Sequence, residues 1–258
     1  FSEEILSRTL VQTVRFSPLP RIARIILALF GALALISPLP YVIILPGQAQ
    51  DVFDKLITIK DQKSYPANGR IDLMSIRVTN PNSWIIGPEI IYSWIRADET
   101  VYPRAAIYPP GTTQKSEDKK AKADMVNSQD TAKTAALSFL RLHPEYGVAA
   151  NDLRIKNISF DVKKTGGPSG GMIFAIGVIE LLTEKDLLKG RHIAGTGTIS
   201  TDGKVGPIGG INLKILAAHK AGATLFLAPA GNSAEIERVP AGIKVVIVAT
   251  LAEAIASL

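Results

Sequence analysis

The sequence predicts a mixed α+β or α/β fold of sheets and packed helices, preceded by an apolar, membrane-spanning helix. A charge-free run, IILALFGALALISPLPYVIIL, extends from Ile25 to Leu45. Residues 71–78 alternate apolar and polar side chains, as a strand with one buried face does. From residue 155 onwards, short apolar runs of strand length alternate with runs of helical period. Together these three patterns favour an anchored α/β protein.

The charge-free run has about the length that a helix needs to cross the hydrocarbon core. Because proline removes a backbone donor and bends a helix, Pro38 and Pro40 predict a helix from about Pro20 to Ser37 with an extended exit. Four arginines precede the run, which predicts a cytoplasmic N-terminus and an extracytoplasmic chain after Pro46: Arg8, Arg15, Arg21 and Arg24. A signal peptide and a buried core helix are the alternatives, but no small-residue cleavage site of the usual kind follows the run.

Three segments follow from this pattern: residues 1–46 as cytoplasmic N-terminus and anchor, 47–150 as an outer segment, and 151–258 as the main domain core. Within the outer segment, the sequence pattern predicts a strand at 71–78, a short buried segment at 84–95 that carries both tryptophans, and a turn at 108–111. Small and apolar side chains at helical spacing then predict a helix within 115–142, packed on one face: Ala132, Ala135, Ala136, Phe139 and Leu140.

The last hundred residues predict a regular alternation of elements. Strands are expected at 155–162, 191–200, 224–228 and 244–249, and helices at 172–182 and 211–221. Residues 201–203 form a hairpin turn signal, and Gly222 stands where a helix C-cap favours glycine. A capping box from Thr250 to Glu253 opens the last helix.

Composition excludes several classes of function. The sequence contains no cysteine, which excludes disulfides, thiolate metal sites and cysteine catalysis, and which fits an extracytoplasmic domain. His143, His192 and His219 lie far apart without metal-ligand spacing, so we expect neither a metal nor another cofactor. The net charge is +6, but the basic residues are scattered without an aromatic stripe, so nucleic-acid binding is not expected.

Ser169 lies in the glycine-rich turn Gly166-Gly-Pro-Ser-Gly-Gly171, immediately before a predicted helix. Glycines let a substrate approach the backbone closely, and a helix N-terminus presents free N–H groups to a developing oxyanion. The serine is therefore a candidate nucleophile, and Gly167 and Gly170 beside it are candidate supporting residues. An ordinary helix N-cap serine is the alternative explanation.

Lys214 is out of pattern on its predicted helix. At about 100° per residue it lies on a face of small and apolar side chains, near Ile211, Ala218 and Ala221. Burial would partly desolvate the ammonium group and lower the lysine pKa, so that the neutral amine can accept a proton. A serine nucleophile without histidine requires such a base. A lysine that snorkels over the edge of the core is the alternative.

The stretches GGPSGG and GTGTISTDGKVGPIGGINLKILAAHKAGA resemble the proteolytic domain of Lon-type serine proteases. The resemblance is dense from Val162 to Pro229 and continues to about the C-terminus. It places the nucleophile at Ser169, the general base at Lys214, and a threonine that supports the lysine amine at Thr196. Lon domains commonly form rings, so the resemblance also implies a homo-oligomer.

The resemblance is closer to a bacterial subgroup that is membrane-anchored and carries no ATPase module. The turn at 108–111 and Ser128-Gln-Asp130 match elements of that subgroup. Its members usually carry a PDZ domain before the catalytic domain, and the few residues between Tyr146 and Ile155 leave no room for one. Gly166 stands where ATP-dependent members have aspartate, and no Gly-x4-Gly-Lys-Ser/Thr motif occurs.

These observations predict an endopeptidase that hydrolyses peptide bonds of unfolded or flexible proteins with a Ser–Lys dyad. Its substrates are protein or peptide segments, and the membrane contacts only the N-terminal helix. Two alternatives stay open: a non-catalytic, membrane-tethered scaffold that retains the fold, and a signal-peptidase-like Ser/Lys enzyme. The second alternative places its serine close to the membrane span, whereas Ser169 lies more than a hundred positions beyond the apolar run.

Overall fold

The computed structural model describes residues 18–96, 98–149, 154–162 and 166–258. A six-stranded sheet in the order β10-β9-β6-β3-β1-β4 lies at its centre. The first four strands of that order run parallel, and β1 runs antiparallel to both β3 and β4. The predicted mixed α/β fold is therefore confirmed. The strands are β1 (Tyr41–Asp51), β3 (Arg70–Val78), β4 (Thr100–Pro103), β6 (His192–Gly195), β9 (Leu225–Pro229) and β10 (Lys244–Val248).

Two small antiparallel sheets complete the strands. β2 (Ile57–Ile59) pairs with β5 (Ile158–Phe160), and β7 (Thr198–Ile199) pairs with β8 (Val205–Gly206) across the predicted hairpin turn. The strand expected over 191–200 is divided into β6 and β7. Between them Thr196 still donates its backbone N–H to Leu227 of β9, whereas Gly197 donates to the carbonyl oxygen of Ser169. The chain thus leaves the sheet to hold the glycine-rich turn.

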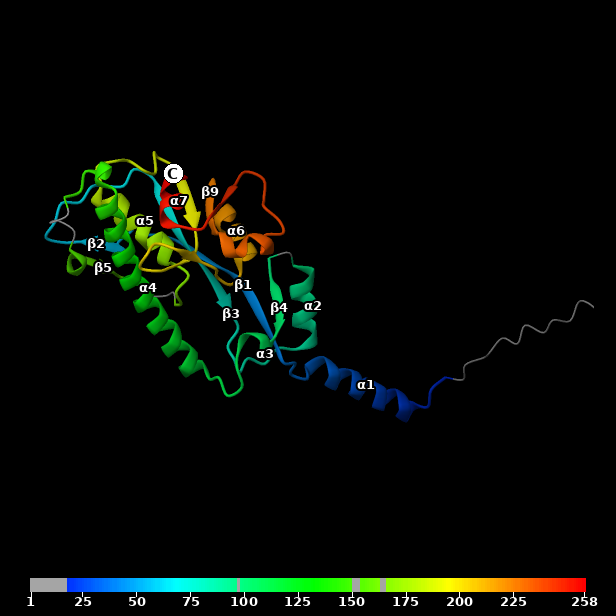
Figure 1. Cartoon of the computed structure of the whole chain (residues 1–258). Helices are drawn as coiled ribbons and strands as arrows, with labels where there is room; N and C mark the ends of the chain where they lie inside the picture. The colour runs from blue at the N-terminus through cyan, green and yellow to red at the C-terminus, as the bar shows by residue number, and fades with distance from the viewer. Residues whose placement is uncertain (1–17, 97, 150–153, 163–165) are drawn as a thin grey trace, which may run out of the picture.

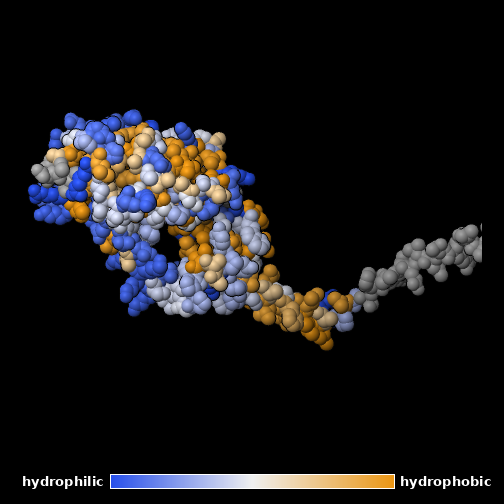
Figure 2. Space-filling model, in the orientation of Figure 1, coloured by the Kyte–Doolittle hydropathy of each residue, from blue (hydrophilic) through white to orange (hydrophobic). Residues whose placement is uncertain are grey.

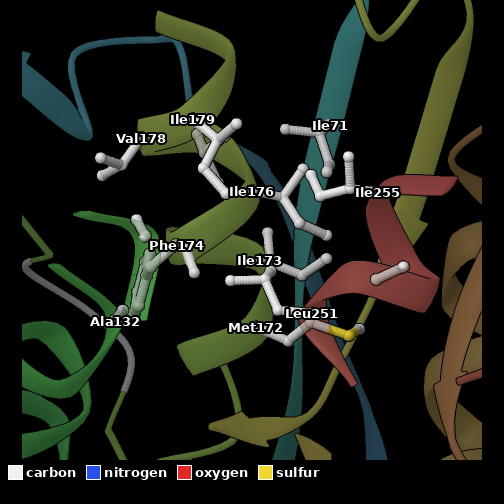
Figure 3. Packing of buried hydrophobic residues seen from close by; sticks show 14 of the residues in the cluster. Ile71, Ala132, Met172, Ile173, Phe174, Ile176, Val178, Ile179, Leu251 and Ile255 are labelled. Carbon is white, nitrogen blue, oxygen red and sulfur yellow. The ribbon is translucent and has the colours of Figure 1, made fainter. Parts of the chain in front are cut away.

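Helices cover both faces of the large sheet (Figure 1). Because side chains alternate along a strand, Leu225 and Leu227 pack into the larger core with α4, α5 and α7, while Phe226 and Ala228 pack with α6 on the other face. Figure 3 shows the larger core around α5, where Ile173 and Ile176 lie between the sheet and Ile255 of α7. These helices are α4 (Gln114–Leu142), α5 (Gly171–Leu182), α6 (Ile211–Lys220) and α7 (Leu251–Ala256).

The predicted helix boundaries hold closely at these four elements. Gly222, just after α6, has φ +89°, in the left-handed region that favours glycine. At the start of α7, the Thr250 hydroxyl accepts the backbone N–H of Glu253, and the Glu253 carboxylate accepts the N–H of Ala249. Among the described residues there are also short turns of helix: α3 (Arg104–Ile107), η1 (Pro144–Tyr146), η3 (Ile155–Asn157) and η4 (Ala230–Glu235). Of these, η3 precedes β5 in the range that was expected to be all strand.

The apolar run near the N-terminus divides between two elements. α1 (Arg21–Ile36) occupies its first part, close to the range expected for a helix, and β1 takes up the last residues from Tyr41 onwards as part of the central sheet. None of the helices in the described ranges has both the length and the apolar character to span a bilayer. The predicted membrane-spanning helix is therefore not found in the part of the chain that the structure describes. The helix ends just before prolines 38 and 40, as expected, and its 16 residues extend only about 24 Å.

The segment expected to be buried at 84–95 forms α2 (Gly87–Ile95), and that expectation is wrong for its tryptophans. Trp84 and Trp94 each have 68% of their surface exposed, whereas Ile90 and Ser93 face the sheet. Aromatic content predicted burial, but the sheet offers α2 only one contact face. Apolar surface covers α1, which extends away from the body of the molecule (Figures 1 and 2).

The predicted outer segment and main domain core share one sheet. β3 of the former pairs in parallel with β6 of the latter along Arg70–Leu73 and His192–Gly195. α4 of the former likewise packs on α5 of the latter in the larger core. The residues around Ser169 are therefore positioned by both segments.

Candidate active site

Ser169 lies two residues before the first residue of α5, in the glycine-rich turn. The turn requires its glycines: Gly167 has φ +87°, and a Cβ at Gly170 would lie 2.6 Å from Leu73 Cδ1. Neighbouring elements hold its carbonyl groups. The Ser128 hydroxyl of α4 donates to the Pro168 carbonyl at 3.0 Å, and the Gly197 N–H donates to the Ser169 carbonyl at 2.8 Å. Ser169 itself stays half-buried, with its hydroxyl directed at α6.

Lys214 extends from α6 to this serine. Its side chain is 2% exposed, and its Nζ lies 2.8 Å from Ser169 Oγ and 2.9 Å from Thr196 Oγ1. Burial lowers the pKa of the Lys214 ammonium to about 7, because a charged amine loses its hydration in the core. A large share of the lysine is therefore neutral near neutral pH, and the neutral amine has a lone pair that can accept the serine proton.

Thr196 determines how the lysine amine is oriented. This threonine is fully buried, and its hydroxyl donates to the Ser169 carbonyl oxygen at 3.0 Å. Because a hydroxyl carries a single proton, Thr196 Oγ1 can only accept from Lys214. Lys214 therefore donates one N–H to Thr196 Oγ1. This leaves the lone pair of the neutral amine free to face Ser169 Oγ.

Asn232 holds the loop that leads into α6. Its side-chain carbonyl accepts the backbone N–H of Ile208, and its amide donates to the Ile208 carbonyl and to the Glu235 carboxylate. Asn232 is fully buried, and Gly210 after the loop has φ +72°. A fully paired amide at this place fixes where α6 begins and hence where Lys214 points.

Two hollows in the surface meet at Ser169. The larger one is lined by Lys214, by Gln48, Ala49 and Gln50 of β1, and by charged side chains of both signs: Asp54, Lys55, Arg77 and Asp161. The second lies beyond the serine and is lined by prolines 168 and 207, Ile208, Thr198 and Glu235. A chain that passes over Ser169 could thus occupy a hollow on each side of the scissile bond.

Gly166 permits close contact between the nucleophile turn and α4. A Cβ at this position would lie 2.7 Å from Ala121 Cβ, and the next residue, Gly167, donates its N–H to the Ala121 carbonyl at 2.9 Å. The aspartate of ATP-dependent Lon proteins could not fit here unless α4 moved. Because Gly166 has no side chain, the serine turn can pack directly against α4.

The structure brings Ser169, Lys214 and Thr196 together and places Gly167 and Gly170 in the turn beside them. Ser128 and Asn232 are site residues that sequence reasoning missed as such. Ser128 bonds to the Pro168 carbonyl of the serine turn, and Asn232 bonds to Ile208 in the loop before α6; both contacts are visible only in three dimensions. Within the described ranges no three acidic or histidine side chains gather as metal ligands, and His192 instead contacts Asp72 at 2.7 Å.

A half-buried serine beside a buried lysine, at the N-terminus of a helix, is the arrangement of serine hydrolases that use lysine as the base. Family comparison agrees with the geometry. The model of the Lon protease (S16) C-terminal proteolytic domain matches residues 125–258, just over half of the chain. The chain therefore belongs to the family of Lon-type proteolytic domains.

Curated relatives match over less than half of the chain. The Lon protease of Desulfosudis oleivorans is 38% identical over 117 residues, which are 43% of this chain and 14% of the relative. Lon protease 1 of Herpetosiphon aurantiacus is 37% identical over 115 residues, which are 42% of this chain and 14% of the relative. The Lon protease of Dictyoglomus thermophilum is 37% identical over 122 residues, which are 45% of this chain and 15% of the relative. The matched part thus spans about a seventh of these relatives.

Proposed function

We propose that this protein is a serine endopeptidase that hydrolyses peptide bonds of unfolded or flexible proteins. The contact of 2.8 Å between Ser169 Oγ and the buried Lys214 Nζ is the observation that carries the proposal. A lysine in water would be charged and could not act as a base at neutral pH. The chain carries no Gly-x4-Gly-Lys-Ser/Thr motif, so we expect its cleavage reaction to proceed without ATP.

In the proposed reaction, neutral Lys214 takes the proton of the Ser169 hydroxyl while Oγ attacks the carbonyl carbon of the scissile bond. Backbone N–H groups at the N-terminus of α5, in the turn around Gly170, are the proposed donors to the oxyanion. Lys214 then gives its proton to the leaving amine, and the peptide bond breaks. Water attacks the acyl-enzyme, passes a proton to Lys214 and releases the acid product as the proton returns to Ser169.

The central sheet favours an extended substrate. β1 pairs with β3 out to Asp51, but β4 covers its other edge only from Tyr41 to Ile44. Beyond that point Gln48, Ala49 and Gln50 line the same hollow as Ser169 and Lys214. A strand edge that no other described strand covers can bind an extended chain through main-chain hydrogen bonds, which a folded substrate cannot offer. The homo-oligomer that the family resemblance implies stays a prediction.

One reporter protein in two states tests this function. The full chain, without ATP, is incubated with a natively folded reporter and with a destabilised variant of the same reporter that is unfolded at the assay temperature. We expect cleavage of the unfolded form at a rate at least about tenfold above that of the folded form, because only an extended segment can reach the serine. A shortened chain that begins at residue 46 is unsuitable for this assay, because it lacks about half of β1. Cleavage of neither form would favour the non-catalytic scaffold instead.

We also propose that the catalytic domain works outside the cytoplasm, attached to a lipid surface by α1. α1 exposes apolar side chains, arginines precede it, and the sequence lacks cysteine. In intact cells, a membrane-impermeant amine reagent is expected to label the exposed lysines of α4, such as Lys120, before lysis. Labelling only after the cells are lysed would contradict this location. A periplasmic protein of the same cells serves as the positive control.

A further inference from the structure

We propose that α2, together with Trp84, forms a second lipid-binding surface that lies in the headgroup region of a bilayer beside α1. This α2 surface consists of Trp84, Ile91, Tyr92, Trp94 and Ile95, each at least 54% exposed. The inference builds on the proposed lipid attachment of α1 and is independent of the proposed peptide cleavage. The α2 surface would make the attachment two-sided and would fix the tilt of the catalytic domain.

The two helices form one continuous apolar region. The Trp84 indole N–H donates to the carbonyl oxygen of Ile36, the last residue of α1, at 3.1 Å. This bond satisfies a carbonyl at a helix C-terminus, where no partner exists within the helix. It also places an exposed indole ring at the junction of the two helices. The exposed side chains of α1 therefore meet the α2 surface at Trp84.

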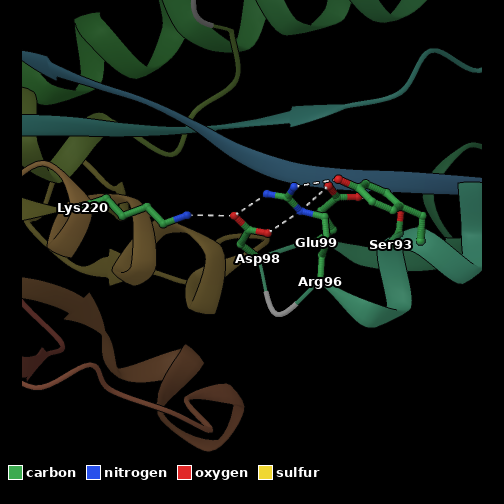
Figure 4. A network of polar contacts seen from close by, with 6 residues as sticks. Ser93, Arg96, Asp98, Glu99 and Lys220 are labelled. Atoms are coloured by element: carbon green, nitrogen blue, oxygen red, sulfur yellow. Dashed lines mark hydrogen bonds and ion pairs between the residues drawn. The ribbon is translucent and has the colours of Figure 1, made fainter.

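Polar contacts with the protein body hold the opposite side of α2 (Figure 4). Ser93 donates to the Glu99 carboxylate at 2.7 Å, and Arg96 bonds to both Asp98 and Glu99. Asp98 in turn pairs with Lys220 of α6 at 2.8 Å. Because α6 also carries Lys214, α2 is linked to the catalytic helix. Its outward residues are thus held in place, and their exposure is a fixed feature of this fold.

The chemistry of the exposed residues favours lipid over a second copy of the chain. From Ile25 to Ile36 α1 has no polar side chain, and Leu27 and Leu35 lie opposite the face of Ile22, Ile26 and Leu33. A partner helix covers one stripe of such a cylinder, whereas lipid covers all of it. Trp and Tyr, with apolar rings and polar tips, concentrate where acyl chains meet headgroups. The arginines at the far end of α1, Arg21 and Arg24, favour anionic lipid.

The two tryptophans are themselves the probe. They are the only ones in the sequence, so Trp84→Phe and Trp94→Phe each leave a single reporter in the α2 surface. The full chain is mixed with vesicles of phosphatidylcholine and phosphatidylglycerol at about 3:1, which contain lipids brominated either near the headgroup or near the acyl-chain end. We expect co-flotation and stronger quenching of both tryptophans by the shallow bromines.

A matched pair of substitutions tests the energetic contribution. Ile95 and Leu142 are each 78% exposed, but Leu142 ends α4, away from the α2 surface. Ile91→Ser with Ile95→Ser is expected to weaken vesicle binding at least about tenfold, because two apolar side chains lose their lipid contact. Leu142→Ser should leave the binding unchanged.

Three outcomes would overturn the inference. Flotation with both tryptophans unquenched would leave α1 as the only lipid contact. Failure to float would remove the attachment of α1 as well. A tryptophan blue shift that depends on protein concentration without lipid would show that a second copy covers the surface. None of these results alters the reporter cleavage assay, so failure of this inference and failure of the proposed peptidase function are distinguishable.

Discussion

Substituting Ser169→Ala is expected to lower the rate of cleavage of an unfolded protein by at least about 10⁴-fold, because the acyl-enzyme route loses its nucleophile. Lys214 and Thr196 keep their places, since the threonine bonds to the backbone carbonyl of residue 169 and not to its side chain. The remaining rate reflects only substrate binding and backbone donors. Single-turnover cleavage with enzyme in excess measures the effect without interference from product release.

The control for this substitution is Ser169→Cys, which keeps a nucleophilic atom at the same place. It should retain cleavage well above the level of the alanine variant, at a rate limited by how the larger sulfur fits beside Lys214. The free energy of unfolding of the alanine variant should lie within about 1 kcal/mol of that of the parent, since the variant loses one half-exposed hydrogen bond. Cleavage by the alanine variant at the parental rate would show that the reaction occurs elsewhere.

The second large effect is expected for Lys214→Met, which should abolish cleavage and stabilise the fold. The folded-state pKa of Lys214 is lowered from 10.5 to about 7. Between those values the unfolded chain binds more protons than the native one, so the stability of the parent rises with pH across this range. At pH 7 and below, burial of the charged Lys214 ammonium lowers the stability of the parent by a few kcal/mol. The net gain expected for methionine is on the order of 3 kcal/mol, because the variant also loses the hydrogen bonds of the lysine. Methionine fills the space without this penalty.

Urea denaturation at pH 6.5 and at pH 10 measures this effect. The methionine variant should exceed the parent in free energy of unfolding by about 3 kcal/mol at pH 6.5. The difference should shrink toward zero at pH 10, because the folded lysine is then neutral and the pH is close to the unfolded pKa of 10.5, so that little of the penalty remains. Equal stability differences at the two pH values would contradict the lowered pKa of Lys214. Lys220→Met, at an exposed position of the same helix, controls for the general loss of a lysine.

Activity should show the same titration. Because the neutral amine is the base, kcat/KM of the parent is expected to rise about tenfold per pH unit below pH 7 and to level off above it. Thr196→Val should lower the plateau by about tenfold or more, because the amine loses the acceptor that orients it, whereas Thr196→Ser should retain the plateau. A rate that is independent of pH between 5 and 8 would exclude Lys214 as the titrating base.

Much of the candidate site could be predicted from the sequence because its signals are local. A serine among four glycines and a proline predicts an unusual turn, and a lysine on the small, apolar face of a helix predicts a buried amine. The burial of Lys214 is confirmed, at 2% exposure. The positions of Ser128 and Asn232 could not be predicted, since each bonds to a backbone group 24 or 40 residues away.

The apolar run shows the limit of local pattern. Within the charge-free run from Ile25 to Leu45, hydrophobicity predicted a membrane-spanning helix that ends near Ser37 and has an extended exit. The structure places that exit, from Tyr41 onwards, in the central sheet. Val42 and Ile44 are buried there against Leu213 of α6. Whether an apolar residue meets lipid or core depends on which partner lies nearby, and no partner is visible in the run itself. The same reason explains why Trp84, just before α2, and Trp94, within α2, were expected to be buried and are exposed.

The sequence by itself determined the periods of the strands and helices, the glycine-rich turn before α5, and the residue types of the dyad, because each depends on neighbours within a few positions. Only the tertiary structure decided that Ser169, Thr196 and Lys214 meet within hydrogen-bond distance, and that the serine turn closes against α4. The contact of Ser169 with Lys214 joins elements from opposite faces of one sheet, and the contact with α4 joins two elements of the same face. Their geometry follows from strand order and packing, which arise only when distant parts of the chain bury their apolar surfaces together.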